Sequence, residues 1–181
     1  MICLIGLSGA GKTTLANRLS KEMGFAVFSV GGLERKIALK KGYSDVVEYE
    51  KKVGLQKAYV SLFPYVIKEL KRVGKQNEGI IVEGVYSPKL FRMMQNAFGK
   101  ERIILLNIAA TRHARLRRLI AREGRKTADA KKNLRALERG KFEVGANEML
   151  KLGKSNTIRN TGTLNETMQK IRLRLRKRMR R

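Results

Sequence analysis

The sequence has little cysteine, little aspartate and no long apolar run. Its single cysteine, Cys3, excludes an internal disulfide and a thiolate metal cluster, and this is typical of a protein in a reducing cytoplasm. Asp45 and Asp129 are its only aspartates, so few carboxylates are left to act as a general base. We therefore expect any acid-base or metal chemistry to depend on glutamate.

No apolar stretch approaches the roughly 20 residues that a membrane-spanning helix needs. The apolar start, Met1 to Leu7, has no basic segment before it and no cleavage site after it, unlike a signal peptide. With 181 residues, 43% hydrophobic and 31% charged, the chain fits one globular domain. The sequence predicts a soluble cytoplasmic protein without a membrane partner, and it leaves the oligomeric state open.

Positive charge is in large excess. Lysine and arginine number 41 against 15 acids, a net charge of +26, and such a field attracts polyanions such as nucleotides or RNA. The window from Arg112 to Lys132 has nine basic and two acidic residues, and the window from Lys170 to Arg181 has eight basic and none acidic. We expect the last helix to fray into a basic tail over residues 171–181, which is either solvated or contacts RNA.

Strand and helix patterns alternate along the chain, which predicts an α/β fold with about five parallel strands and helices on both faces of the sheet. The stretch from Glu123 to Lys132 is loop-like and is predicted to form a flap. Strands are predicted at 2–5, 26–28, 79–83, 102–108 and 157–159, and helices at 13–23, 33–41, 45–73 with a kink at Pro64, 88–98, 111–122, 131–152 and 164 to the end.

The strongest chemical signal is the segment from Gly6 to Thr13, which matches G-x-x-x-x-G-K-[ST] between an apolar strand and a helix pattern. The glycines let backbone N–H groups point inward, and the helix adds its positive N-terminus, so the loop binds oligophosphate. Lys12 is expected to bridge the β- and γ-phosphates, and the Thr13 hydroxyl to coordinate Mg²⁺. The motif indicates a three-layer P-loop NTPase fold with ATP and Mg²⁺ as cofactors. The predicted nucleotide contacts are Gly6, Ser8, Gly9, Ala10, Gly11, Lys12, Thr13 and Thr14.

Four further segments, 29–35, 80–84, 118–125 and 158–164, follow in the order and spacing of the small P-loop kinases. Residues 1–170 resemble the nucleoside-monophosphate and dephospho-coenzyme A kinases and an archaeal adenylate-kinase-related family. The resemblance implies an acceptor-binding helical region at about 32–75 and a lid at about 123–145. It also implies that Asn160 lies beside the purine.

Phosphoryl transfer requires a metal-side carboxylate, guanidinium groups and a cover that excludes water. Glu83 ends the strand predicted beside the first strand, so with Thr13 it is the candidate metal ligand. Arg118, Arg122 and Arg125 form one helical stripe, either a solvated face or an anion site. We predict Lys12, Glu83, Arg122 and Arg125 as catalytic residues and Arg118 as a nucleotide contact.

The acceptor is not determined. Monophosphate kinases carry an aspartate near the place of Gly31 and an arginine after the acid-glycine pair, where this chain has Val85, Tyr86 and Ser87. Arg35, Tyr86 and Arg139 are the remaining acceptor candidates.

The general base is open as well. It is Glu83 or Glu34, unless the acceptor is an ionised phosphate that needs no base.

Three functions therefore compete. The chain is a small-molecule kinase acting on a nucleotide or another phosphate-bearing or hydroxyl acceptor, an RNA-associated kinase or ATPase, or a nucleotide-dependent regulatory protein. No N/T-K-x-D motif follows the fourth strand, which argues against a GTPase.

Overall fold

Five parallel strands form one sheet in the computed structural model, which describes residues 1–124 and 126–179. The strands are β1 (Ile2–Ile5), β2 (Ala26–Ser29), β3 (Ile80–Glu83), β4 (Ile104–Ala109) and β5 (Thr157–Arg159), in the order β2-β3-β1-β4-β5. Leu4 lies beside Glu83 in the register of β1 and β3. The predicted fold class and the predicted position of the Glu83 strand are both confirmed.

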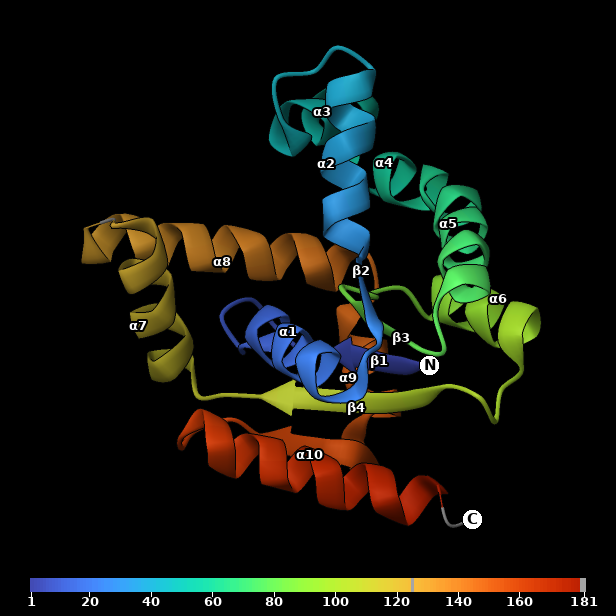
Figure 1. The fold of residues 1–181 in the computed structure, drawn as a ribbon. Coiled ribbons are helices and arrows are strands. Elements are labelled where there is room, and N and C mark those ends of the chain that lie inside the picture. The colour runs from blue at the N-terminus through green and yellow to red at the C-terminus, as the bar shows by residue number, and fades with distance from the viewer. Residues whose placement is uncertain (125, 180–181) are drawn as a thin grey trace.

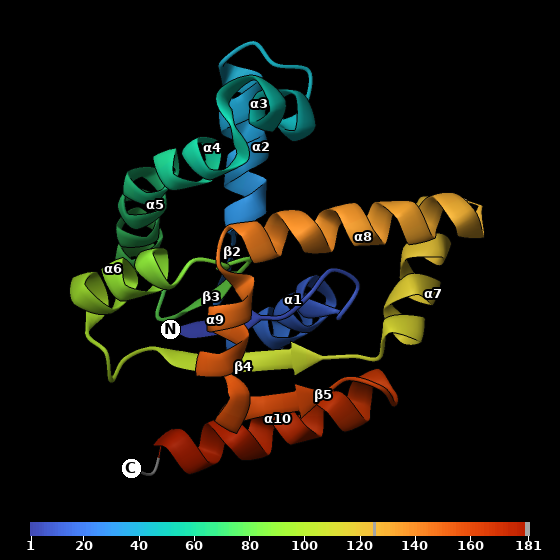
Figure 2. The same ribbon diagram turned by 180° about the vertical axis from the view of Figure 1, so that it is seen from behind.

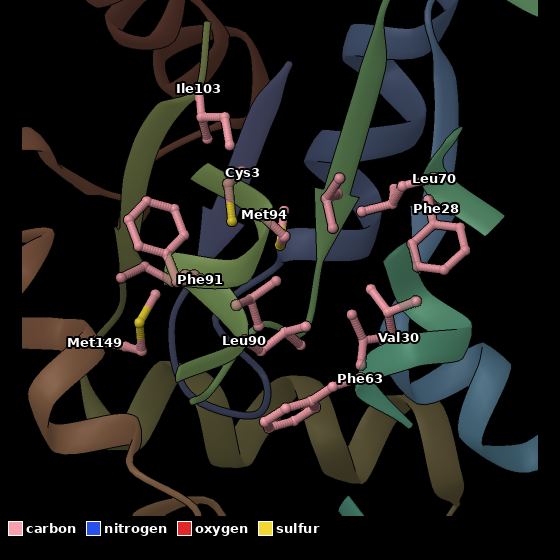
Figure 3. Close-up of a cluster of buried hydrophobic side chains, with 14 of the residues drawn as sticks. Cys3, Phe28, Val30, Phe63, Leu70, Leu90, Phe91, Met94, Ile103 and Met149 are labelled. Atoms are coloured by element: carbon pink, nitrogen blue, oxygen red, sulfur yellow. The ribbon is translucent and has the colours of Figure 1, made fainter. Parts of the chain in front are cut away.

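Helices cover both faces of this sheet because its strands are apolar on both sides. Cys3 and Ile5 of β1 face a cluster with α5 (Phe63–Gln76), α6 (Pro88–Phe98) and α9 (Ala146–Leu152), part of which is drawn in Figure 3. Ile2 and Leu4 face the opposite cluster, with α1 (Lys12–Met23) and α10 (Leu164–Met179). The two clusters define three layers.

Two helical extensions rise from the sheet (Figures 1 and 2). One consists of α2 (Val30–Lys40), α3 (Val46–Val53) and α4 (Leu55–Ser61). The other consists of α7 (Arg112–Glu123) and α8 (Thr127–Glu143), and α8 runs back from the tip of α7 toward the base of α2. A short 3-10 helix, η1 (Lys154–Asn156), precedes β5.

The predicted helix over 45–73 is three helices. Gly54, with a φ of 91°, ends α3, and Leu62 separates α4 from α5. Pro64 lies in the first turn of α5, where its missing N–H costs no helical hydrogen bond, so it starts a helix and does not kink one.

The predicted flap over 123–132 is wrong, because α8 begins at Thr127. Asp129 in its first turn interacts favourably with the helix dipole, a signal that the basic residues around it conceal. The predicted helix over 131–152 breaks at Gly145, which has a φ of 106°.

The predicted tail is wrong as well, since α10 continues to Met179. Ile171 and Leu175 are 0% and 5% exposed, and they continue an apolar stripe from Met168 at helical spacing. Arg172 forms an ion pair with Glu22 at 2.8 Å. The alternation of apolar and basic residues concealed this stripe, and Arg180 and Arg181 lie outside the described residues. None of the described helices is long and apolar enough to cross a membrane.

Candidate active site

The loop from Gly6 to Gly11 connects β1 to α1 at the carboxyl edge of the sheet. Gly6, Gly9 and Gly11 have φ values of 142°, 75° and 94°, which residues other than glycine rarely adopt. A Cβ on Gly9 would lie 2.7 Å from the carbonyl oxygen of Arg115. Glycine is therefore required both for the backbone conformation and for the close approach of the next helix.

Lys12 is buried in the mouth of this loop, with 9% of its surface exposed. Its Nζ donates to the carbonyl oxygens of Gly6 at 2.8 Å and Leu7 at 3.2 Å. Burial lowers the Lys12 pKa to about 8, although the charge of Glu83 acts in the opposite direction. An anion that enters the loop would favour the charged form of this amine.

Thr13 and Glu83, the two predicted metal ligands, are in contact. The Thr13 Oγ1 donates to Glu83 Oε2 at 2.8 Å, and Glu83 is 8% exposed. A hydroxyl and a carboxylate beside a phosphate-binding loop fit Mg²⁺, which takes few protein oxygens and completes its shell with phosphates and water. These residues would hold the metal.

Arg118 and Asn160 fix the far side of the loop. Arg118 Nη1 donates to the carbonyl oxygens of Gly9 and Ala10, each at 3.3 Å, and its Nη2 donates to Asn160 O at 2.9 Å. The Asn160 Nδ2 donates to Ala10 O at 2.8 Å, and its Oδ1 accepts from Thr167 Oγ1 at 3.0 Å. Asn160 thus positions the loop itself, a role that the resemblance did not include.

Three residues that connect α7 and α8 to the loop were not predicted from the sequence. Arg115, 7% exposed, donates to Ser8 O at 3.3 Å and forms an ion pair with Glu138 of α8. One turn later, Lys141 contacts the Ser8 hydroxyl, and its Nζ lies 4.9 Å from the centre of the Tyr86 ring. Together these contacts hold α8 over the loop. No motif marks the three residues, and the spacing of Glu138 and Lys141 by three is the only sequence signal.

Lys141 is a second buried amine at the same loop. Burial, and then the charges of Lys12 and Arg115, lower the Lys141 pKa to about 7, while Glu138 acts in the opposite direction. Tyr86 lies beside both amines, because Lys12 Nζ is 5.8 Å from its ring centre. Such a concentration of positive groups is suited to a polyphosphate.

Several other predicted site residues are exposed. Thr14 is exposed on α1, and Arg122 is exposed in the last turn of α7. Arg35 on α2 and Arg139 on α8 are exposed and belong to none of the loop contacts given above. Arg125 lies outside the described residues.

Helix α2 contains a buried carboxyl group, Glu34, which is 8% exposed. Its Oε1 has no hydrogen-bond partner among the described residues. Burial and the charge of Glu50 raise the Glu34 pKa to about 7, against the effect of Arg35. An unpaired buried oxygen costs stability, so this position favours a ligand that donates a hydrogen bond.

Tyr59 fixes the loop that follows β3. Its hydroxyl donates to Gly84 O at 3.2 Å and accepts from the Tyr86 N–H at 2.9 Å. These contacts hold Tyr86 next to the two buried amines.

Comparisons with known proteins agree with this fold. Residues 2–139 match the model of an AAA domain. A UPF0200 protein of Pyrococcus horikoshii is 32% identical over 94% of this chain and 93% of its own. The solved structures of TT1252 from Thermus thermophilus, a gluconokinase from Sinorhizobium meliloti and a shikimate kinase from Aquifex aeolicus match with TM-scores of 0.64, 0.58 and 0.57. Their identities are 21%, 12% and 18%, and they cover 97%, 93% and 97% of this chain and 96%, 87% and 95% of their own.

Proposed function

The chain belongs to the UPF0200 family and carries an AAA domain of P-loop kinase fold, and from this premise we propose that it transfers the γ-phosphoryl group of ATP to a small molecule, with Mg²⁺. The contact between Thr13 and Glu83 beside the buried Lys12 carries the proposal. It brings a hydroxyl and a carboxylate that would hold Mg²⁺ next to a buried amine that would contact phosphate, as phosphoryl transfer requires.

The residues of the site would have different roles in phosphoryl transfer. The loop N–H groups bind the β- and γ-phosphates, and Lys12 exchanges its carbonyl partners for phosphate oxygens. Mg²⁺ held at Thr13 and Glu83 would neutralise charge on the β- and γ-oxygens. Arg118 keeps the loop in shape, and Lys141 and Arg122 add positive charge from the lid side.

We infer that the acceptor carries a hydroxyl group and is not held by a monophosphate clamp. The exposed Arg35 and the segment Val85 to Ser87 do not supply that clamp, whereas Glu34 offers an unpaired oxygen to a hydroxyl donor. The acceptor oxygen forms a bond to the γ-phosphorus, the bond to the bridging β,γ-oxygen breaks, and ADP leaves. The hydroxyl proton goes to a carboxylate, and we assign it to Glu34. Two proteins of similar fold are named gluconokinase and shikimate kinase, which supports a hydroxyl acceptor.

The test is transfer from labelled ATP to a panel of gluconate, shikimate, nucleoside monophosphates, dephospho-coenzyme A and short RNAs. We expect transfer to a hydroxyl compound, lost in Lys12→Ala and reduced at least 100-fold in kcat in Glu83→Gln, since a single preorganised electrostatic contact contributes about 10²–10³. Glu34→Gln should reduce transfer without weakening ATP binding. Hydrolysis with no transfer to any compound would contradict the kinase proposal and favour an ATPase.

A further inference from the structure

A hollow of about 590 Å³ lies between the edge strand β5 and helix α10. Its lining combines basic side chains from η1, β5 and α10 with two uncharged residues from β5. The lining residues are Lys154, Thr157, Ile158, Arg159, Lys170 and Arg174.

The four basic side chains of this basic groove have no acidic counterpart in the described part of the chain. None of them forms an ion pair with any residue that the structure describes. Arg172, their neighbour on α10, does pair with Glu22, but neither of these two residues lines the groove. Like charges gathered around one hollow repel each other, and an anionic ligand would remove this repulsion.

Lys170 and Arg174 are four residues apart, so they lie on one side of α10 and face the same hollow as Arg159. Ile171 and Leu175 of the same helix are buried in the core, which fixes the position of this basic side. The groove is therefore a preformed feature of a packed helix and not of a mobile tail.

We propose that the basic groove binds single-stranded nucleic acid through its phosphodiester backbone. A hollow with cations on two sides accommodates a narrow charged chain, whereas a membrane presents a flat surface. No aromatic side chain lines the groove, so it offers no stacking platform for bases. Binding should consequently be independent of base sequence and strongly dependent on salt. This binding does not depend on the proposed phosphotransfer.

The experiment measures fluorescence anisotropy of labelled 20-mers of rU, rA and dT with the full chain. If four phosphates are neutralised, affinity should fall roughly 50-fold between 50 and 200 mM salt, from a slope of about −0.7 per phosphate. In Lys170→Gln/Arg174→Gln, two contacts remain and the fall should be only about 7-fold. Affinity at 50 mM salt should drop at least ~10-fold, and rU and rA should bind equally well. The affinities for rU and dT show whether the groove binds RNA or DNA more tightly.

The matched control is Lys71→Gln/Lys75→Gln, which removes two exposed cations four residues apart on α5, on the opposite face of the sheet. It should keep the salt slope of the unmodified protein. A second variant, Lys154→Gln/Arg159→Gln, should repeat the groove effect through different elements, and unchanged thermal unfolding midpoints confirm that each variant is folded. The proposal would be overturned if the groove variants and the control variant lost equal affinity for rU. It would also be overturned if the groove variants lost affinity for anionic vesicles but kept their affinity for rU.

Discussion

Lys12 and Lys141 are two amines whose pKa values are lowered by the same site, to about 8 and about 7. Their burial is unfavourable for the charged form, and bound phosphate would reverse that. Both amines should therefore gain positive charge when phosphate binds to the loop.

This gives a prediction for Lys141. At pH 8 its amine is largely neutral, so ATP binding should take up roughly one proton through it. Calorimetry in two buffers of different ionisation enthalpy measures the total uptake. Lys141→Met should keep only the roughly half proton that Lys12, with a pKa of about 8, takes up at this pH. Lys151→Met, an exposed lysine of α9, is the control. Unchanged uptake in Lys141→Met would assign the proton to Lys12.

Glu34 gives a prediction for stability. Its pKa is raised from 4.5 to about 7 in the folded protein, so the folded state binds more protons than the unfolded state between these values. Its contribution to the free energy of unfolding is then lost as pH rises from about 4.5 to 7, by up to about 3 kcal/mol.

Glu34→Gln should remove that loss. Its free energy of unfolding relative to the unmodified protein should increase with pH over this range, as urea titrations at pH 4.5 and 8 would measure. Glu78→Gln, at an exposed position, controls for the lost negative charge. If the difference in the free energy of unfolding between the two proteins stayed constant with pH, the pKa of Glu34 would not be raised in the folded state.

At the scale of elements, α8 is held over the loop from Gly6 to Gly11 by the Arg115–Glu138 pair, whose side chains are 8% and 16% exposed. Removing one partner of a buried pair leaves an uncompensated charge, at a cost of about 3–5 kcal/mol. We predict that Glu138→Gln makes amide hydrogen exchange in residues 127–143 at least ~10-fold faster and that ATP restores part of the protection. Lys132→Gln, an exposed change on the same helix, should leave exchange unchanged. Equal exchange in both variants would mean that other contacts hold α8.

The same scale explains what the sequence could and could not predict. The strands and the loop were predictable because a buried parallel strand is an apolar run and the loop has a fixed pattern of glycine and lysine. The contact between Thr13 and Glu83 follows from the neighbouring positions of β1 and β3. Arg115, Glu138 and Lys141 were not predictable, because their roles depend on where α8 lies in space. The course of α10 was missed since two apolar residues, Ile171 and Leu175, decide it within a basic segment.

At the scale of the whole molecule, a net charge of +26 opposes the compact state through self-repulsion. Some of the few acids reduce this repulsion by forming ion pairs. Glu22 pairs with Arg18 and Arg172, and Glu138 pairs with Arg115. The basic groove is a place where the repulsion is left uncompensated.

Salt should therefore stabilise this protein. Raising ionic strength from about 0.01 to 0.15 M shortens the screening length from about 30 to 8 Å, so the unfolding temperature should rise. Calorimetry in sodium chloride measures this, and tripolyphosphate at equal ionic strength should raise the unfolding temperature further because it also binds the loop. A falling unfolding temperature in sodium chloride would show that attractive pairs outweigh the repulsion.

The contact between Asn160 and the loop from Gly6 to Gly11 also has a consequence for the protein's synthesis. Asn160 and Ala10 are 150 residues apart in the chain, and β1 lies between strands that are both made later. At about 5–20 residues per second, a ribosome needs roughly 8–30 s to reach Asn160 after it has made the loop. Throughout this interval the emerging chain carries the loop without the strands and side chains that shape it, so a phosphate ligand should stabilise the chain only after Asn160 has been made.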